Sequence, residues 1–177
     1  SVREFEYNEE SPSERPRRQK RPLTLKSRAI RYLAQREYSR KELRQKLLRA
    51  QGDEPNERAV DELLDELEKR NYLSDERFAG TRARVRSSKF GNARIAYELK
   101  MQGVSAEHIA QALSPLKETE FERAQALWVR RFGSAPKDFK ERAKQIRYLS
   151  ARGFSMDVIR RVIESAGADI EDSFNFE

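Results

Sequence analysis

The side chains that most often carry out catalysis are scarce in this sequence. The 177 residues include one histidine, His108, and no cysteine, which excludes thiolate nucleophiles, disulfides and multi-histidine zinc sites. Carboxylates are dense over residues 57–68, but on a charged helix this density indicates a solvated face rather than an acid and base pair. No glycine-rich phosphate loop, zinc-protease motif or serine-hydrolase motif occurs. We therefore expect no catalytic, cofactor-binding or metal-binding residues, and no enzymatic activity.

Basic side chains, in contrast, recur at helical spacing and could bind a row of anionic groups. Arg82 and Arg86 are four residues apart, as are Lys140 and Lys144. Ribbons of this kind pair with nucleic-acid phosphates or with a row of carboxylates on a protein. The alternative is a solvated face that has no partner. The candidate residues for binding a partner or DNA are Arg77, Arg82, Arg84, Arg86, Lys89, Arg94, Lys140, Lys144 and Arg147.

The charge of the chain is unevenly distributed. In total, 37 Lys and Arg oppose 30 Asp and Glu, which gives a net charge of +7. Residues 23–166 hold 31 basic and 21 acidic side chains, whereas residues 167–177 hold four acidic and no basic ones. A body with this balance favours a polyanionic partner, although charge of mixed sign is also common on helical surfaces that bind nothing. No membrane span or secretory signal is visible, so we expect a cytoplasmic monomer without membrane contact.

The elements that carry these residues are predicted to be helices. Between residues 24 and 166 the apolar period is near 3.6, and runs of alternating β-branched residues are lacking. For instance, Phe139, Ala143 and Ile146 fall at i, i+4 and i+7, which predicts that they form the buried face of one helix. The predicted helices span residues 24–36, 40–49, 57–71, 75–87, 92–102, 106–113, 119–132, 138–152 and 156–166.

Two helix starts carry a recognisable capping signal. Ser39 with Glu42, and Thr119 with Glu122, fit the capping box. In this motif each side chain binds the backbone N–H of the other residue. We therefore expect both hydroxyls to accept a hydrogen bond from the first turn of the helix that follows.

Part of the sequence repeats itself. Residues 30–47 align without gaps to residues 146–163, with seven identities in eighteen positions, and residues 99–113 match a third time. Each copy has a helix end, a short turn, an apolar residue and a serine that begins the next helix. Glycine and asparagine suit a left-handed turn residue, whereas glutamate suits it poorly. The turn residues are Glu37, Asn71, Gly103 and Gly153, and the apolar residues expected to be buried after them are Tyr38, Tyr72, Val104 and Phe154.

The repeat predicts an all-α fold. We expect three tandem three-helix, helix-turn-helix-like repeats in an elongated, curved row, over residues 23–73, 74–115 and 116–166. Units of this size are too small to be stable alone, so neighbours are expected to share buried surface. Residues 1–22, a charged tail with several prolines, and the acidic tail 167–177 are expected to be disordered.

Four segments, in order, resemble the RecX family of bacterial regulators of the RecA recombinase. They are ELRQKL at 42–47, NYLSDERFA at 71–79, FGNARIAYELKMQGV at 90–104 and IRYLSARGF at 146–154. The resemblance covers about residues 24–166. Glu37 and Asn71 depart from it, because glycine is common at these turns in the family.

The resemblance implies a non-enzymatic protein that binds the RecA filament on single-stranded DNA and lies along its groove. There it would inhibit ATP hydrolysis, strand exchange and stimulated repressor cleavage. The partners that it implies are the RecA filament and single-stranded DNA, with double-stranded DNA left open, and the basic residues would face acidic protein surface or DNA. The alternative is a stand-alone basic helical DNA-binding protein, of nucleoid or transcriptional type.

Overall fold

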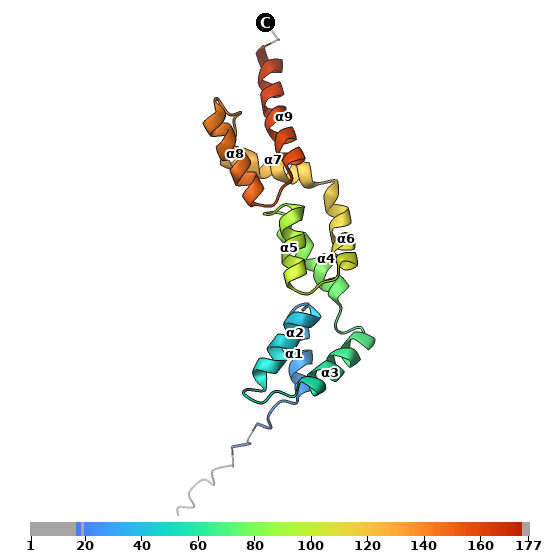
Figure 1. Cartoon of the computed structure of the whole chain (residues 1–177). Coiled ribbons are helices and arrows are strands. Elements are labelled where there is room, and N and C mark those ends of the chain that lie inside the picture. The colour runs from blue at the N-terminus through green and yellow to red at the C-terminus, as the bar shows by residue number, and fades with distance from the viewer. Residues whose placement is uncertain (1–16, 19, 175–177) are drawn as a thin grey trace, which may run out of the picture.

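All regular secondary structure in the described part of the chain is α-helical. The computed structural model describes residues 17–18 and 20–174, which form nine α-helices and no strand (Figure 1). This confirms the all-α prediction. The helices are α1 Leu25–Gln35, α2 Arg40–Ala50, α3 Glu57–Lys69, α4 Asp75–Arg86, α5 Asn92–Met101, α6 Ala106–Lys117, α7 Glu120–Arg131, α8 Phe139–Ala151 and α9 Met156–Phe174.

The helices form three consecutive units, α1–α3, α4–α6 and α7–α9. Figure 1 shows the units following one another in an extended, curved row, with α1–α3 at one end and α9 at the other. The closest helix pairs, such as α4 with α6 and α7 with α9, lie within units. The predicted row of three-helix repeats is confirmed.

Each unit has its own hydrophobic core. Leu43 and Leu64 are fully buried in the first unit, Ile95 and Leu99 in the second, and Ile159 in the third. No core cluster of the described residues crosses from one unit to the next. Neighbouring units nevertheless share buried surface, as expected, and this surface is largely polar. The buried Gly91 donates to the Arg152 carbonyl, and the half-buried Arg123 binds carbonyls of the second unit.

Polar caps fix most of the helix starts. The Ser39 hydroxyl accepts a hydrogen bond from the Glu42 N–H at 3.1 Å, as the capping box predicts. The Thr119 prediction is wrong, because no backbone N–H of the described helix α7 donates to its side chain. Its hydroxyl instead donates to the Leu116 carbonyl and accepts from Arg123 Nε.

The turns between helices follow the repeat with one exception. Asn71, Gly103 and Gly153 have φ of 61°, 77° and 89°, so all three adopt the left-handed conformation that was predicted. Tyr72 does not enter the core and is 53% exposed. Leu73, one residue later, is buried in its place.

Two helices are longer than predicted. Helix α6 continues through Pro115 to Lys117, and α9 continues to Phe174 rather than ending at residue 166. Much of the segment expected to be an acidic tail is therefore helical backbone. Residues 1–16 and 19 of the predicted tail lie outside the described residues, and residues 17–18 and 20–22 form no helix or strand. Within the described part of the chain, no helix is long and apolar enough to cross a membrane.

Candidate partner-binding surface

The nine candidate basic residues separate into two groups. Arg77, Arg86 and Arg94 are engaged by other parts of the chain, whereas the remaining six make no ion pair with a described residue. The first group lies at or beside the places where units meet. These places are named here the first joint, between α1–α3 and α4–α6, and the second joint, between α4–α6 and α7–α9.

Arg77 belongs to the first joint. Its Nε bonds Glu37 Oε1 at 2.9 Å, and its other nitrogens reach Asn71 Oδ1 and the Tyr72 carbonyl. Nearby, the backbone N–H of Arg40 donates to Asp75 Oδ1 at 2.7 Å. Arg77 therefore holds the first two units together, and its guanidinium is not free to bind a partner.

Arg86 and Arg94 surround a single aromatic ring beside the second joint. Their guanidinium carbons lie 4.2 Å and 4.3 Å from the centre of the Phe90 ring. Arg86 forms a two-pronged hydrogen bond with Glu98, and this bond holds the pKa of the Glu98 carboxyl below its ordinary value. Arg94 also donates to the carbonyl of Ala151 in the third unit. Both arginines thus support the packing of Phe90 and the second joint.

Arg123, which the sequence did not single out, is the main side chain of the second joint. Its half-buried guanidinium reaches backward from α7 into the second unit, and burial lowers its pKa. The acceptors are the carbonyls of Ser87, Phe90 and Leu116, the side-chain oxygen of Asn92 and the Thr119 hydroxyl. Nothing in the local sequence distinguishes this arginine from a solvent-facing one, because its partners are distant backbone carbonyls.

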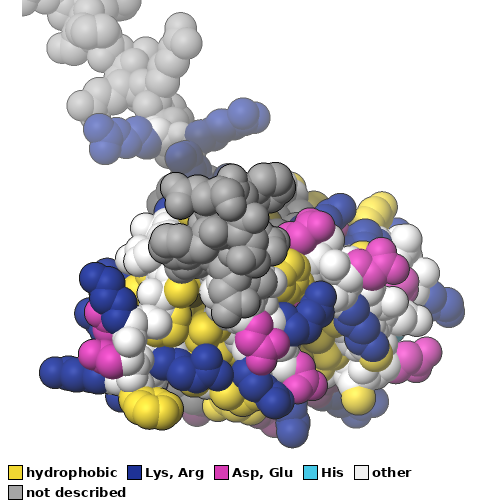
Figure 2. Space-filling view, turned by 90° about the horizontal axis from the view of Figure 1, so that it is seen from above, with side chains coloured by type: hydrophobic (Ala, Val, Ile, Leu, Met, Phe, Trp, Pro, Cys, Tyr) yellow, Lys and Arg dark blue, Asp and Glu magenta, His cyan; other side chains and the backbone are white. Residues whose placement is uncertain are grey.

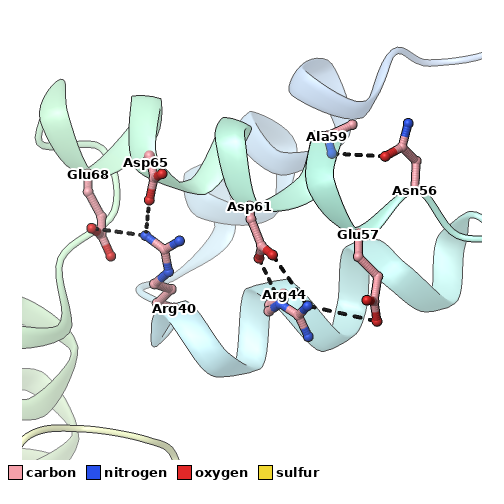
Figure 3. A network of polar contacts seen from close by, with 8 residues as sticks. All are labelled: Arg40, Arg44, Asn56, Glu57, Ala59, Asp61, Asp65 and Glu68. Carbon is pink, nitrogen blue, oxygen red and sulfur yellow. Dashed lines mark hydrogen bonds and ion pairs between the residues drawn. The ribbon is translucent and has the colours of Figure 1, made fainter.

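The acidic stretch over residues 57–68 is also partly neutralised within the fold. Figure 3 shows Arg40 and Arg44 of α2 directed at the carboxylates of α3. Arg44 bonds Asp61 at 2.8 Å, and this hydrogen bond lowers the pKa of the Asp61 carboxyl. Arg40 reaches Asp65 at 2.7 Å. Part of the face expected to be solvated therefore pairs α3 with α2.

Three candidates lie on or after α4. Arg82 is half-buried, with its guanidinium 5.6 Å from the centre of the Phe78 ring. Arg84 and Lys89 are exposed. A shallow hollow beside Arg82 is lined in addition by Arg36, Glu37, Phe78, Thr81 and Val85. In this hollow Arg36 pairs with Glu42 and Glu37 pairs with Arg77, so Arg82 is the one charged lining residue that makes no ion pair with a described residue.

The other three candidates form an uninterrupted exposed row on α8. Lys140, Lys144 and Arg147 are named here the α8 ribbon; they are exposed and unpaired within the described chain. Their spacing of four and three residues places them along one side of the helix. In the view from the C-terminal end of the row, Lys and Arg side chains project from the rim of the molecule with hydrophobic side chains exposed between them (Figure 2).

Phe139, which lies beside the α8 ribbon, is exposed although it was predicted to be buried. The period of the helix predicted that Phe139 is buried with Ala143 and Ile146. The ring is instead 91% exposed, because Phe139 is the first residue of α8 and precedes the part of the helix that contacts the core. The exposed aromatic residue therefore lies at the start of α8, and the α8 ribbon follows it along the same helix.

The remaining chemistry of the described residues is limited. No group of three or more His, Asp or Glu side chains in the described segments is arranged to hold a metal ion. His108 is half-buried on α6, and its Nδ1 atom finds no hydrogen-bond partner among the described residues.

Comparison with known proteins identifies the family. Residues 74–113 match the family model described as the second three-helix domain of RecX, and residues 118–163 match the third. A regulatory protein RecX from Ralstonia pickettii is 46% identical over 86% of this chain and 94% of its own length. The regulatory protein RecX from Leptothrix cholodnii is 46% identical over 81% of this chain and 90% of its own.

The fold is shared with solved structures as well. The crystal structure of RecX from Lactobacillus salivarius superimposes with a TM-score of 0.70, covering 81% of this chain and 95% of the other at 21% identity. This likeness concerns the arrangement of the helices, and the sequence matches above carry the family assignment. The chain belongs to the RecX family of regulatory proteins.

Proposed function

We propose that this protein is a non-enzymatic regulator that binds the RecA filament on single-stranded DNA and inhibits its ATPase, strand-exchange and coprotease activities. Membership of the RecX family carries the proposal, because relatives named as regulatory proteins match over most of the chain. The extended row of three units supports it, since a long and narrow molecule offers a continuous contact surface to a repetitive partner.

The charge distribution indicates which surface would contact the filament. Arg77, Arg86 and Arg94 are held in place by partners in the chain, so the available positive charge of the second unit is smaller than its arginine content suggests. The cations of the α8 ribbon are exposed and make no ion pair with any described residue. We therefore place the main anion-binding contact on the third unit and a weaker one on Arg82, Arg84 and Lys89.

The test is ATP hydrolysis by RecA on single-stranded DNA with this protein titrated from far below to equal stoichiometry. Strong inhibition at a small fraction of RecA supports filament binding. A variant with Lys140→Gln, Lys144→Gln and Arg147→Gln should require at least tenfold more protein for the same inhibition. Its matched control is Arg31→Gln, Arg49→Gln and Lys69→Gln, which removes equal charge from exposed positions of the first unit and should inhibit as well as the parent.

Two results would contradict the proposal. Equal loss of inhibition in both triple variants would show that net charge matters and that the α8 ribbon does not. Absence of inhibition at equal stoichiometry, with naked DNA still bound, would instead favour a stand-alone DNA-binding protein. Substitution of Arg86 is unsuitable for this test, because it removes the partner of Glu98 and disturbs the packing beside the second joint.

A further inference from the structure

The exposure of Phe139 has no explanation in the fold. At 91%, this side chain is far more exposed than Val85 at 67% or Tyr97 at 63%, the next most exposed large hydrophobic residues among those described. The core of the third unit is complete without it, since Leu149 and Ile159 are fully buried. Exposing a large aromatic ring to water is unfavourable, so burying the ring against a binding partner would lower the free energy.

The surroundings of the ring are strongly basic. Residues 136–147 contain five Lys and Arg and only two acidic residues, Asp138 and Glu141. Both carboxylates serve the helix start: Asp138 Oδ1 accepts from the Glu141 N–H at 2.8 Å, and Glu141 Oε2 accepts from the Lys137 N–H at 2.8 Å. These hydrogen bonds fix the start of α8, where Phe139 lies, while the cations around it make no ion pair with a described residue.

The ring also forms part of a shallow hollow. Pro136, Lys137, Asp138 and Arg142 line this hollow together with Phe139. A flat ligand lying on the ring would therefore be flanked by the cations Lys137 and Arg142, and by the Asp138 carboxylate, which caps α8. From the edge of the hollow, the α8 ribbon continues for about 10 Å, given a rise of about 1.5 Å per residue.

We propose that Phe139 stacks on an unpaired base of single-stranded DNA while the α8 ribbon binds the phosphates of the nucleotides that follow. An exposed aromatic ring beside a row of cations is the arrangement by which proteins hold single strands without reading their sequence. Duplex DNA keeps its bases stacked on one another and offers the ring nothing comparable. The inference rests on the proposed function only for the choice of single-stranded DNA as the ligand.

The experiment separates the contact with the base from the contact with the phosphate. Fluorescence anisotropy would measure the dissociation constants of a labelled oligothymidylate and of an abasic oligonucleotide of equal length, which has the phosphates without the bases. Phe139→Ala should weaken binding of the oligothymidylate about tenfold and change binding of the abasic strand less than twofold. Tyr97→Ala removes an exposed aromatic residue of the second unit and should change neither.

A phosphate contact gives the opposite pattern. Lys140→Gln with Lys144→Gln should weaken binding of both oligonucleotides alike. It should also reduce the salt dependence of log K by about 1.4, because each phosphate contact on a single strand contributes about 0.7. Because Phe139 is outside the core, Phe139→Ala should unfold at the same temperature as the parent, so a loss of binding would not reflect unfolding.

The outcomes distinguish this inference from the proposed function. Equal effects of Phe139→Ala on the two oligonucleotides, or no effect on either, would overturn base stacking, as would failure of the parent to bind oligothymidylate. If Phe139→Ala reduces inhibition of RecA without changing DNA binding, the ring contacts protein, and only the present inference is wrong. If the base-dependent loss is observed but the parent does not inhibit RecA, stacking stands and the proposed function fails.

Discussion

The two joints of this molecule connect similar units in different ways. At the first joint, side chains make the hydrogen bonds, as in Glu37 with Arg77 and in Asp75 with the backbone of Arg40. At the second joint, backbone meets backbone: the Gly91 N–H donates to the Arg152 carbonyl at 2.7 Å, and the Ala93 N–H to the Gly153 carbonyl at 3.2 Å. A backbone contact cannot rearrange by changing a rotamer, so the second joint is expected to be the stiffer one.

The turn between the second and third helices of a unit explains this difference between the joints. Gly103 and Gly153 occupy equivalent positions of the repeat, and each faces the preceding unit. A Cβ on Gly103 would meet the side chain of Lys41, with Cβ at 2.9 Å. A Cβ on Gly153 would overlap Arg94 Cβ and lie 2.6 Å from the backbone nitrogen of Arg94. The second joint therefore depends on the absence of a side chain, whereas the first joint tolerates one better.

The largest expected effect comes from alanine at these two glycines. Both substitutions strain a left-handed residue by about 1 to 2 kcal/mol. Gly153→Ala should cost roughly 4 kcal/mol of unfolding free energy, because the clash with backbone adds to the strain. Gly103→Ala should cost roughly 2 kcal/mol. Urea unfolding of the two variants measures the difference, and equal losses would show that the joints do not differ in this respect.

A smaller effect is expected from the arginines that serve the two joints. Arg123→Met keeps the aliphatic stem but leaves the Ser87 and Phe90 carbonyls and the Asn92 oxygen without the donor that Arg123 supplies, which should cost about 3 kcal/mol. Arg77→Met should cost about 1 kcal/mol, because water can solvate the partners of Arg77. Thermal unfolding of both variants provides the comparison. A greater loss of stability from Arg77→Met than from Arg123→Met would mean that the first joint contributes more to stability than the second.

The sequence predicted the elements well and the connections between them poorly. Helices, left-handed turns and the repeat depend on local patterns, such as the serine at position 39 or the glycine at position 153. The second joint depends on backbone atoms that carry no sequence signal, so neither the role of Arg123 nor the hydrogen bond from Gly91 to the Arg152 carbonyl could be predicted. Tyr72 and Leu73 illustrate the intermediate case, in which the pattern located the buried position to within one residue.

For the candidate surface, too, the sequence predicted what depends on local spacing and missed what depends on packing between helices. Helical spacing correctly placed Lys140, Lys144 and Arg147 in one exposed row, because spacing is a local property. It could not reveal that Arg86 pairs with Glu98, since that pairing depends on how α4 packs on α5. It misplaced Phe139 because the apolar period of α8 continues to the first residue of the helix, beyond the part that contacts the core.

The smallest effect is expected for the ion pair between Glu37 and Arg77, and its coupling free energy shows how strongly this pair holds the first joint. Glu37 and Arg77 are both partly exposed, with side-chain accessibilities of 31% and 39%, so water screens their ion pair. A double-mutant cycle with Glu37→Gln and Arg77→Gln should give a coupling free energy of about 0.5 kcal/mol that declines further in 1 M salt. A coupling above about 2 kcal/mol would mean that this ion pair holds the first joint as firmly as backbone contacts hold the second. The observed asymmetry would then lie in the chemistry of the joints and not in their strength.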